Sequence, residues 1–154
     1  MTLYDVIGAI EAAAARQPSV NMIVRQDIYR LNDIADARYG VFGWLQGQHR
    51  GATQRSTRTY GFTLFYVDRL IEGEPLDDTA AAGMEAVQSV AVETLDNIVK
   101  ALAAEGIMPE PYTFRTFNQR FADQCAGAYV EVELTAELDY VCGNNYKDKI
   151  VDIK

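Results

Sequence analysis

The sequence predicts an α+β protein of two layers, in which two long helices cover a mostly antiparallel sheet. Apolar residues recur at helical spacing after the N-terminus and again over residues 78–105. Two further stretches, residues 39–69 and 112–134, are rich in aromatic and β-branched residues that alternate as in strands. The predicted order is therefore helix, hairpin, helix, hairpin. Residues 1–138 form one expected domain, and residues 139–154 form a C-terminal arm or tail.

The first helix is expected to begin at Thr2 and to stop at Pro18. Thr2 can cap it, and Asp5 stands three positions on, where the acid of a capping box belongs. Its apolar stripe consists of Leu3, Val6, Ile7, Ile10, Ala13 and Ala14. The alternation over residues 20–24 then predicts a short strand.

The first hairpin contains the strongest predicted strand of the chain. Residues 46–59 are polar and are expected to form a loop or a long hairpin tip. The strand that follows is apolar on both faces, with Phe65 and Val67 opposite to a second set. That second set is Tyr60, Phe62, Leu64 and Tyr66. Such a strand is either covered twice or covered on one face by a partner subunit.

The second helix is expected to run from Asp77 or Asp78 to Glu105, with Gly106 ending it. Its buried stripe is Met84, Val87, Ala91, Leu95, Ile98 and Leu102.

The last hairpin is expected to contain a β-bulge and a glycine turn. Tyr112 and Phe114 would lie on one face of this strand, but Phe117 and Phe121 do not follow the same alternation. An extra residue would restore it, which predicts a bulge near Thr116. The turn is expected to use the backbone freedom of Gly127 and a hydrogen bond from Asp123 to its own backbone. In the second strand, Val130, Val132 and Leu134 should face inward, and Tyr129, Glu131 and Glu133 outward.

The composition is that of an ordinary soluble globular protein, with 49% hydrophobic and 23% charged residues. A formal charge of −8 at pH 7 disfavours sequence-independent binding to nucleic acid, because like charges repel. Two cysteines, Cys125 and Cys142, are too few for a disulfide framework and are expected to be reduced thiols of a cytosolic protein. We expect no signal peptide and no membrane span.

The sequence indicates no catalytic site, no metal site and no cofactor. His49, the only histidine, stands in the polar loop without a nucleophile beside it. Asp68 and Arg69 are neighbours on a strand, so they point to opposite faces and favour structural ion pairs or a subunit contact. Four alternating acids at the chain's last strand could bind a hard cation, although a solvated strand face is favoured. They are Glu131, Glu133, Glu137 and Asp139.

One basic cluster stands in the otherwise acidic chain, namely Arg50, Arg55 and Arg58 in the loop over residues 46–59. It either contacts nucleic acid or an acidic partner surface, or it is a solvated hairpin tip. The candidate subunit-interface residues are Arg50, Arg55, Arg58, Phe65, Val67, Arg69 and Tyr129.

Three stretches carry a resemblance to a known class of proteins: "VRQDIYRLN", "YGFTLFYVDRL" and "FNQRFADQCAGAYVEVEL". With the helix between the second and third, they resemble the small neck and tail-completion proteins of tailed bacteriophages, of the tail-terminator type. The residue pattern of the strands is similar to that of ring or connector proteins of Bacteroides-type gut phages, including crAss-like phages. The resemblance covers roughly residues 1 to 138, and the family has no catalytic residues to carry over.

The resemblance implies a structural virion protein that forms a homo-oligomeric ring, of six or twelve copies, at the head–tail connector or tail terminus. Its partners would be neighbouring neck or tail proteins, with DNA passing transiently through the channel, and it would be assembled in the host cytoplasm. The alternative is a small cytosolic ligand-binding domain or enzyme with an aromatic pocket. That pocket would be lined by Tyr60, Phe62, Tyr66, Phe114 and Phe121.

Overall fold

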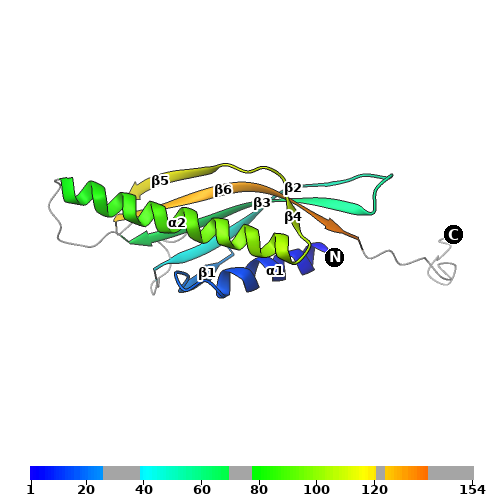
Figure 1. Cartoon of the computed structure of the whole chain (residues 1–154), viewed down its shortest axis with the longest axis horizontal. Helices are drawn as coiled ribbons and strands as arrows, with labels where there is room; N and C mark the ends of the chain where they lie inside the picture. Colours follow the sequence, from blue (N-terminus) through cyan, green and yellow to red (C-terminus); the bar gives the residue numbers. More distant parts are fainter. Residues whose placement is uncertain (26–38, 70–77, 121–123, 139–154) are drawn as a thin grey trace, which may run out of the picture.

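Two helices and six strands are described by the computed structural model, which covers residues 1–25, 39–69, 78–120 and 124–138 (Figure 1). The helices are α1 (Leu3–Ala15) and α2 (Asp78–Ala104). The strands are β1 (Met22–Val24), β2 (Val41–Gly51), β3 (Thr57–Arg69), β4 (Met108–Pro109), β5 (Phe114–Arg120) and β6 (Gln124–Glu137). Several predictions lie outside the described residues, namely those on Phe121, Asp123, Asp139, Cys142 and the arm over residues 139–154.

The α+β class is confirmed, but the expectation of two long helices is not. Helix α2 has 27 residues and α1 has only 13, because Pro18 and the turn before it leave α1 little length. The order helix, hairpin, helix, hairpin is not confirmed either, because β1 pairs in parallel with β2 and the short strand β4 precedes the last hairpin. The sequence therefore predicted the α+β class, but not the full order of the elements.

The six strands form one mixed sheet in the order β1-β2-β3-β6-β4, with β5 also paired to β6. Strand β1 runs parallel to β2, and the other pairings are antiparallel. Strands β4 and β5 pair with different parts of β6, at Leu134–Thr135 and at Gln124–Val130. Between them the Glu110 amide donates to the Glu133 carbonyl at 2.9 Å, so β4 and β5 act as one interrupted edge strand.

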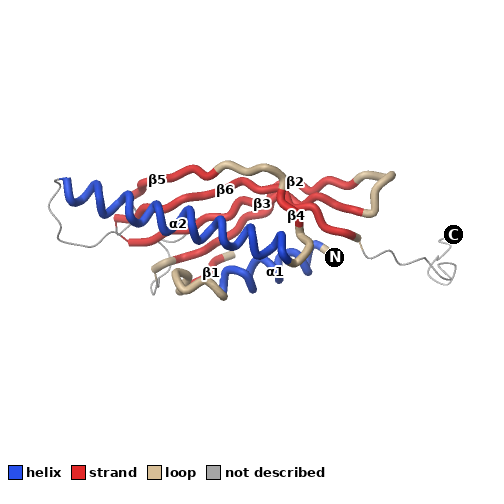
Figure 2. The backbone as a smooth tube through the Cα atoms, in the orientation of Figure 1, coloured by secondary structure: helices blue, strands red, loops and turns tan. Residues whose placement is uncertain are grey.

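Both helices pack on the same face of the sheet, as Figure 2 shows. The predicted capping box of α1 is present, since the Thr2 hydroxyl accepts from the Asp5 amide at 3.2 Å and the Asp5 carboxylate accepts from the Thr2 amide at 2.8 Å. The core combines side chains of α1 and α2 with one phase of the strands. Its fully buried large members include Ile10, Phe42, Tyr60, Leu64, Tyr66, Leu95, Ile98, Leu102 and Leu134. Gly106, at φ 87°, ends α2 as predicted.

The opposite face of the sheet carries a second apolar cluster of Val41, Phe65, Val67 and Cys125. Phe65 and Val67 are only 2% and 0% exposed. The prediction that β3 is apolar on both faces is thus confirmed. Phe65 and Val67, chosen as subunit-interface residues, are buried within a single chain.

The last hairpin corrects two predictions. Strands β5 and β6 pair without a register shift from Phe114 to Arg120, so the bulge expected near Thr116 is wrong. Phe117 needs no bulge, because its ring lies on the helix-free face against Gly127, 2.9 Å from where a Cβ of Gly127 would stand. Gly127 itself lies within β6 and not in a turn. The register shift among these strands is in β2, between Gln46 and His49.

Candidate functional site

The β2–β3 hairpin extends past the ends of both helices and forms one end of the molecule (Figure 1). Strand β2 continues to Gly51 and β3 begins at Thr57, so of the two predictions for residues 46–59, a loop or a long hairpin tip, the hairpin tip is confirmed. The bulge in β2 places the Gln48 carbonyl oxygen directly over Gly61, 2.5 Å from where a Cβ would stand. Only glycine fits at position 61, because the contacting atom belongs to the backbone.

Strand pairing divides the three arginines of this hairpin between two faces. Arg50 lies opposite Thr59 on the helix-free face, and its guanidinium donates to the Glu133 carboxylate at 2.7 Å. Arg58 lies on the helix-bearing face, where its guanidinium sits over the Tyr60 ring, 5.9 Å from the centroid. The single basic cluster of the sequence is therefore two separate positive sites.

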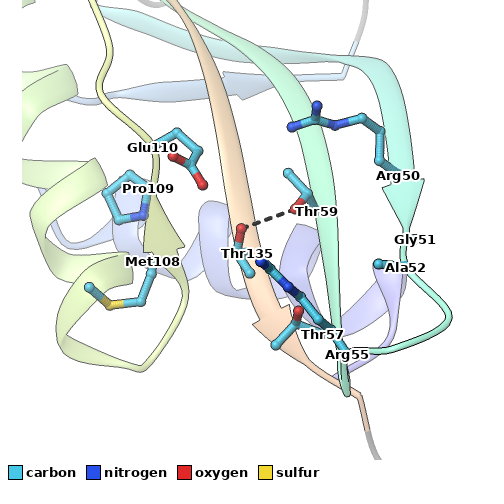
Figure 3. A pocket seen from close by; sticks show the side chains of 10 residues that line it. All are labelled: Arg50, Gly51, Ala52, Arg55, Thr57, Thr59, Met108, Pro109, Glu110 and Thr135. Carbon is cyan, nitrogen blue, oxygen red and sulfur yellow. Dashed lines mark hydrogen bonds between the residues drawn. The ribbon is translucent and has the colours of Figure 1, made fainter.

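Arg50 and Arg55 line a surface hollow of about 480 Å³ at the tip end of the helix-free face (Figure 3). We call it the arginine hollow. Its floor holds three threonines, and the hydroxyls of two of them, Thr59 and Thr135, are hydrogen-bonded across β3 and β6 at 3.1 Å. Glu110 borders it from the side of β4. Hydroxyl and guanidinium donors therefore outnumber the acids that face this hollow.

A second hollow, of about 490 Å³, lies beside the first and shares Glu110 with it. Its lining includes Gly61 and the carboxylates of Glu131 and Glu133. The sequence had raised a cation site along this strand, but within the residues that the structure describes no group of three or more acids, histidines or cysteines could hold a metal. One of these acids, Glu133, already pairs with Arg50.

The remaining candidate residues are placed away from these hollows. Tyr129 is partly buried beside Phe117, with ring centroids 6.4 Å apart. The Arg69 guanidinium lies 5.9 Å from the centroid of the Tyr39 ring. His49 is exposed in β2 and stacks edge-on to Tyr60, with centroids 5.5 Å apart.

At the other end of β3, Asp68 makes hydrogen bonds within the chain, and the expected ion pair or subunit contact stays a prediction. Its carboxylate accepts from the Arg69 amide at 2.8 Å and from the Tyr66 hydroxyl at 3.5 Å. Burial, and then the negative charge of Asp68, raise the pKa of Tyr66 to about 12, so this phenol stays protonated. The phenol also donates to the Ser19 carbonyl at 2.9 Å, which ties β3 to the segment after α1.

Sequence reasoning missed the three threonines of the arginine hollow and Glu110. Thr57 and Thr59 alternate with Arg58, which signals a polar strand face, but Thr135 and Glu110 join them only through the pairing of β3, β6 and β4. Thr59 and Thr135, joined by the β3–β6 pairing, are 76 residues apart in the sequence, and no local pattern contains that contact.

Comparison of the sequence with protein-family models and with curated proteins finds no match to either. None of the described helices is long and apolar enough to cross a bilayer.

Proposed function

We propose that this chain is a structural subunit of an oligomeric ring, of the kind found at the head–tail connector or tail terminus of a tailed bacteriophage, and that it has no catalytic site. The observation that carries the proposal is the β2–β3 hairpin, which extends beyond the helices with arginines on both of its faces. A paired, cationic projection on an acidic chain is a surface suited to contact with another acidic subunit.

The chemistry of the described residues agrees with a structural role. Among the described residues, no carboxylate is a partner of His49, and the imidazole contacts Gln46, Tyr60 and Phe62. At least half of the residues that line each hollow are polar or charged, whereas clefts that bind small molecules are largely apolar.

Most of the aromatic residues considered for a ligand pocket are packed in the core. Tyr60, Phe62 and Tyr66 are at most 2% exposed and pack against α1 and α2. Phe114 packs on the same core from β5. For this reason we put forward no second function.

The ring that we propose has six or twelve copies, neighbours among the neck or tail proteins of the virion, and a channel through which DNA passes. An overall charge of −8 suits such a channel, because like charge lets DNA slide without adhering. Assembly would take place in the host cytoplasm, and no cofactor takes part.

Native mass spectrometry and sedimentation velocity over a range of protein concentrations test the proposal. We expect a closed species of defined copy number that grows with concentration, and a ring in negative-stain images. A chain that stays monomeric or dimeric at every concentration would contradict the proposal.

A further inference from the structure

The arginine hollow contains a cation, Arg55, that forms no ion pair with the residues that the structure describes. Arg50, in contrast, is paired with Glu133. The Arg55 side chain extends from the hairpin turn toward Thr135 and lines the hollow (Figure 3). A guanidinium beside threonine hydroxyls is a good receptor for a carboxylate, which can accept from several of these donors at once.

The charge of this hairpin is opposite to that of the rest of the chain. Residues 46–59 contain three arginines and no acid, a charge of +3, and the whole chain has a charge of −8, so the remaining residues carry −8 − 3 = −11. The most acidic short stretch is "EGEPLDD", residues 72–78, with four acids and no base. No lysine or arginine follows it until Lys100.

The basic hairpin and the acidic stretch are attached to opposite ends of the molecule. Residues 70–77 connect the end of β3 at Arg69 to the start of α2 at Asp78, and both of these lie at the end opposite the hairpin tip (Figure 1). The 13 residues of β3 alone separate the two ends by about 40 Å, at roughly 3.3 Å per residue. A contact between the two is therefore much easier between copies than within one.

We propose that the arginine hollow of one copy binds the acidic segment Glu72–Asp78 of a second copy, head to tail. This inference rests on the proposed function, because it supplies the contact from which the ring is built. Different surfaces of the two copies meet in such a contact, which closes into a ring when the rotation between copies allows it. Carboxylates of the segment bind Arg55 and compete with Glu133 for Arg50.

The test uses the division of the arginines between the two faces. Arg55→Ser and Arg58→Ser each remove one positive charge from the same hairpin, but only Arg55 lines the arginine hollow. Loss of a charge-assisted contact of roughly 1.5 kcal/mol should raise the dissociation constant for assembly about tenfold in Arg55→Ser. Arg58→Ser should stay within about twofold of wild type. Equal effects of the two substitutions would refute the role of the hollow.

Salt and charge reversal provide the second arm. The Arg55 contribution should shrink between about 0.1 M and about 1 M salt, as the Debye length falls from about 10 to about 3 Å. Arg55→Glu and Glu74→Arg should each weaken assembly alone. A mixture of the two variants should form heterodimers. The Arg55→Glu chain keeps its native acidic segment and the Glu74→Arg chain keeps its native hollow, so these two surfaces can still bind each other. A mixture that stays unassembled would refute the head-to-tail contact.

A synthetic peptide separates this inference from the proposed function. The peptide EGEPLDD, titrated into the full chain and followed by NMR, should shift the amides of Gly51, Thr59 and Thr135. The neutral peptide QGQPLNN and the Arg55→Ser chain serve as controls and should show no such shifts. If the wild-type chain proves monomeric, the ring is refuted, and the peptide still decides whether the hollow receives this segment. Equal binding of the two peptides would overturn the inference.

Discussion

Gly127 in β6 allows a sharp test of the sheet geometry. A Cβ at this position would collide with the backbone carbonyl oxygen of Tyr66 and would stand 2.9 Å from Cζ of Phe117. The carbonyl belongs to β3, which is paired on both sides and cannot move without disturbing two ladders. Gly127→Ala should therefore cost about 3 kcal/mol of unfolding free energy, at the upper end of the range for overpacking. Valine should cost more.

Gly8 provides the matched control. It lies in α1, is exposed, and has no atom within 4 Å of where a Cβ would stand. Gly8→Ala should stabilise the protein by about 0.5–1 kcal/mol, because alanine loses less backbone entropy in a helix.

Urea unfolding followed by Trp44 fluorescence measures both substitutions. Trp44 is the only tryptophan and is 9% exposed, so its emission will report the loss of the core. A loss of about 3 kcal/mol corresponds to a fall of roughly 6–12 °C in Tm for a chain of this size. If Gly127→Ala lies within about 0.5 kcal/mol of wild type while Gly8→Ala stabilises, the close approach of β6 to β3 is wrong.

Three further outcomes are expected. His49→Ala should leave assembly unchanged in sedimentation velocity, because the His49 side chain is exposed. A loss of assembly, or of a measurable turnover, would contradict the structural role. Thr2→Ala should cost about 1 kcal/mol in urea unfolding through the lost cap of α1, and an unchanged midpoint would show that the cap contributes nothing. Hydrogen bonds from Lys100 and then Tyr112 hold the pKa of Asp96 below its usual value of about 4. The ionised Asp96 therefore stabilises the folded state above about pH 4, and this contribution is lost as the pH falls through the lowered pKa. Asp96→Asn should flatten the decline in stability below about pH 4, and an acid limb as steep as that of wild type would contradict this assignment.

The parts of the fold that depend on local periodicity could be predicted from the sequence. The stripe of α2 was predicted correctly at Ala91, Leu95, Ile98 and Leu102, all fully buried, because a helix repeats its core contacts every three or four residues. The two faces of β3 follow in the same way from its period of two.

The errors arose where a side chain depends on a distant strand. Phe117 broke the expected alternation of β5, and a bulge was the local explanation. Its ring instead lies on the helix-free face of the sheet, where Gly127, ten residues later in β6, leaves room for it. The sequence predicted one cluster of arginines, because the spacing from Arg50 to Arg58 does not reveal where the turn reverses the chain. The arginine hollow could not be predicted, since it needs Thr135 and Glu110 placed beside β3.

The Gln88 side chain on α2 donates to the Phe117 carbonyl of β5 at 3.2 Å. Strand β5 pairs with β6 on one side only among the described strands, so this carbonyl would otherwise be available to a foreign strand. An incoming chain would first have to displace an amide that the helix holds in place. The consequence is a restraint on how the protein can polymerise: extension of the sheet by backbone pairing at β5 is penalised. In the ring that we propose, copies would therefore not join by backbone pairing at β5, and contacts between side chains would hold neighbours at a fixed angle that lets growth end in a closed object.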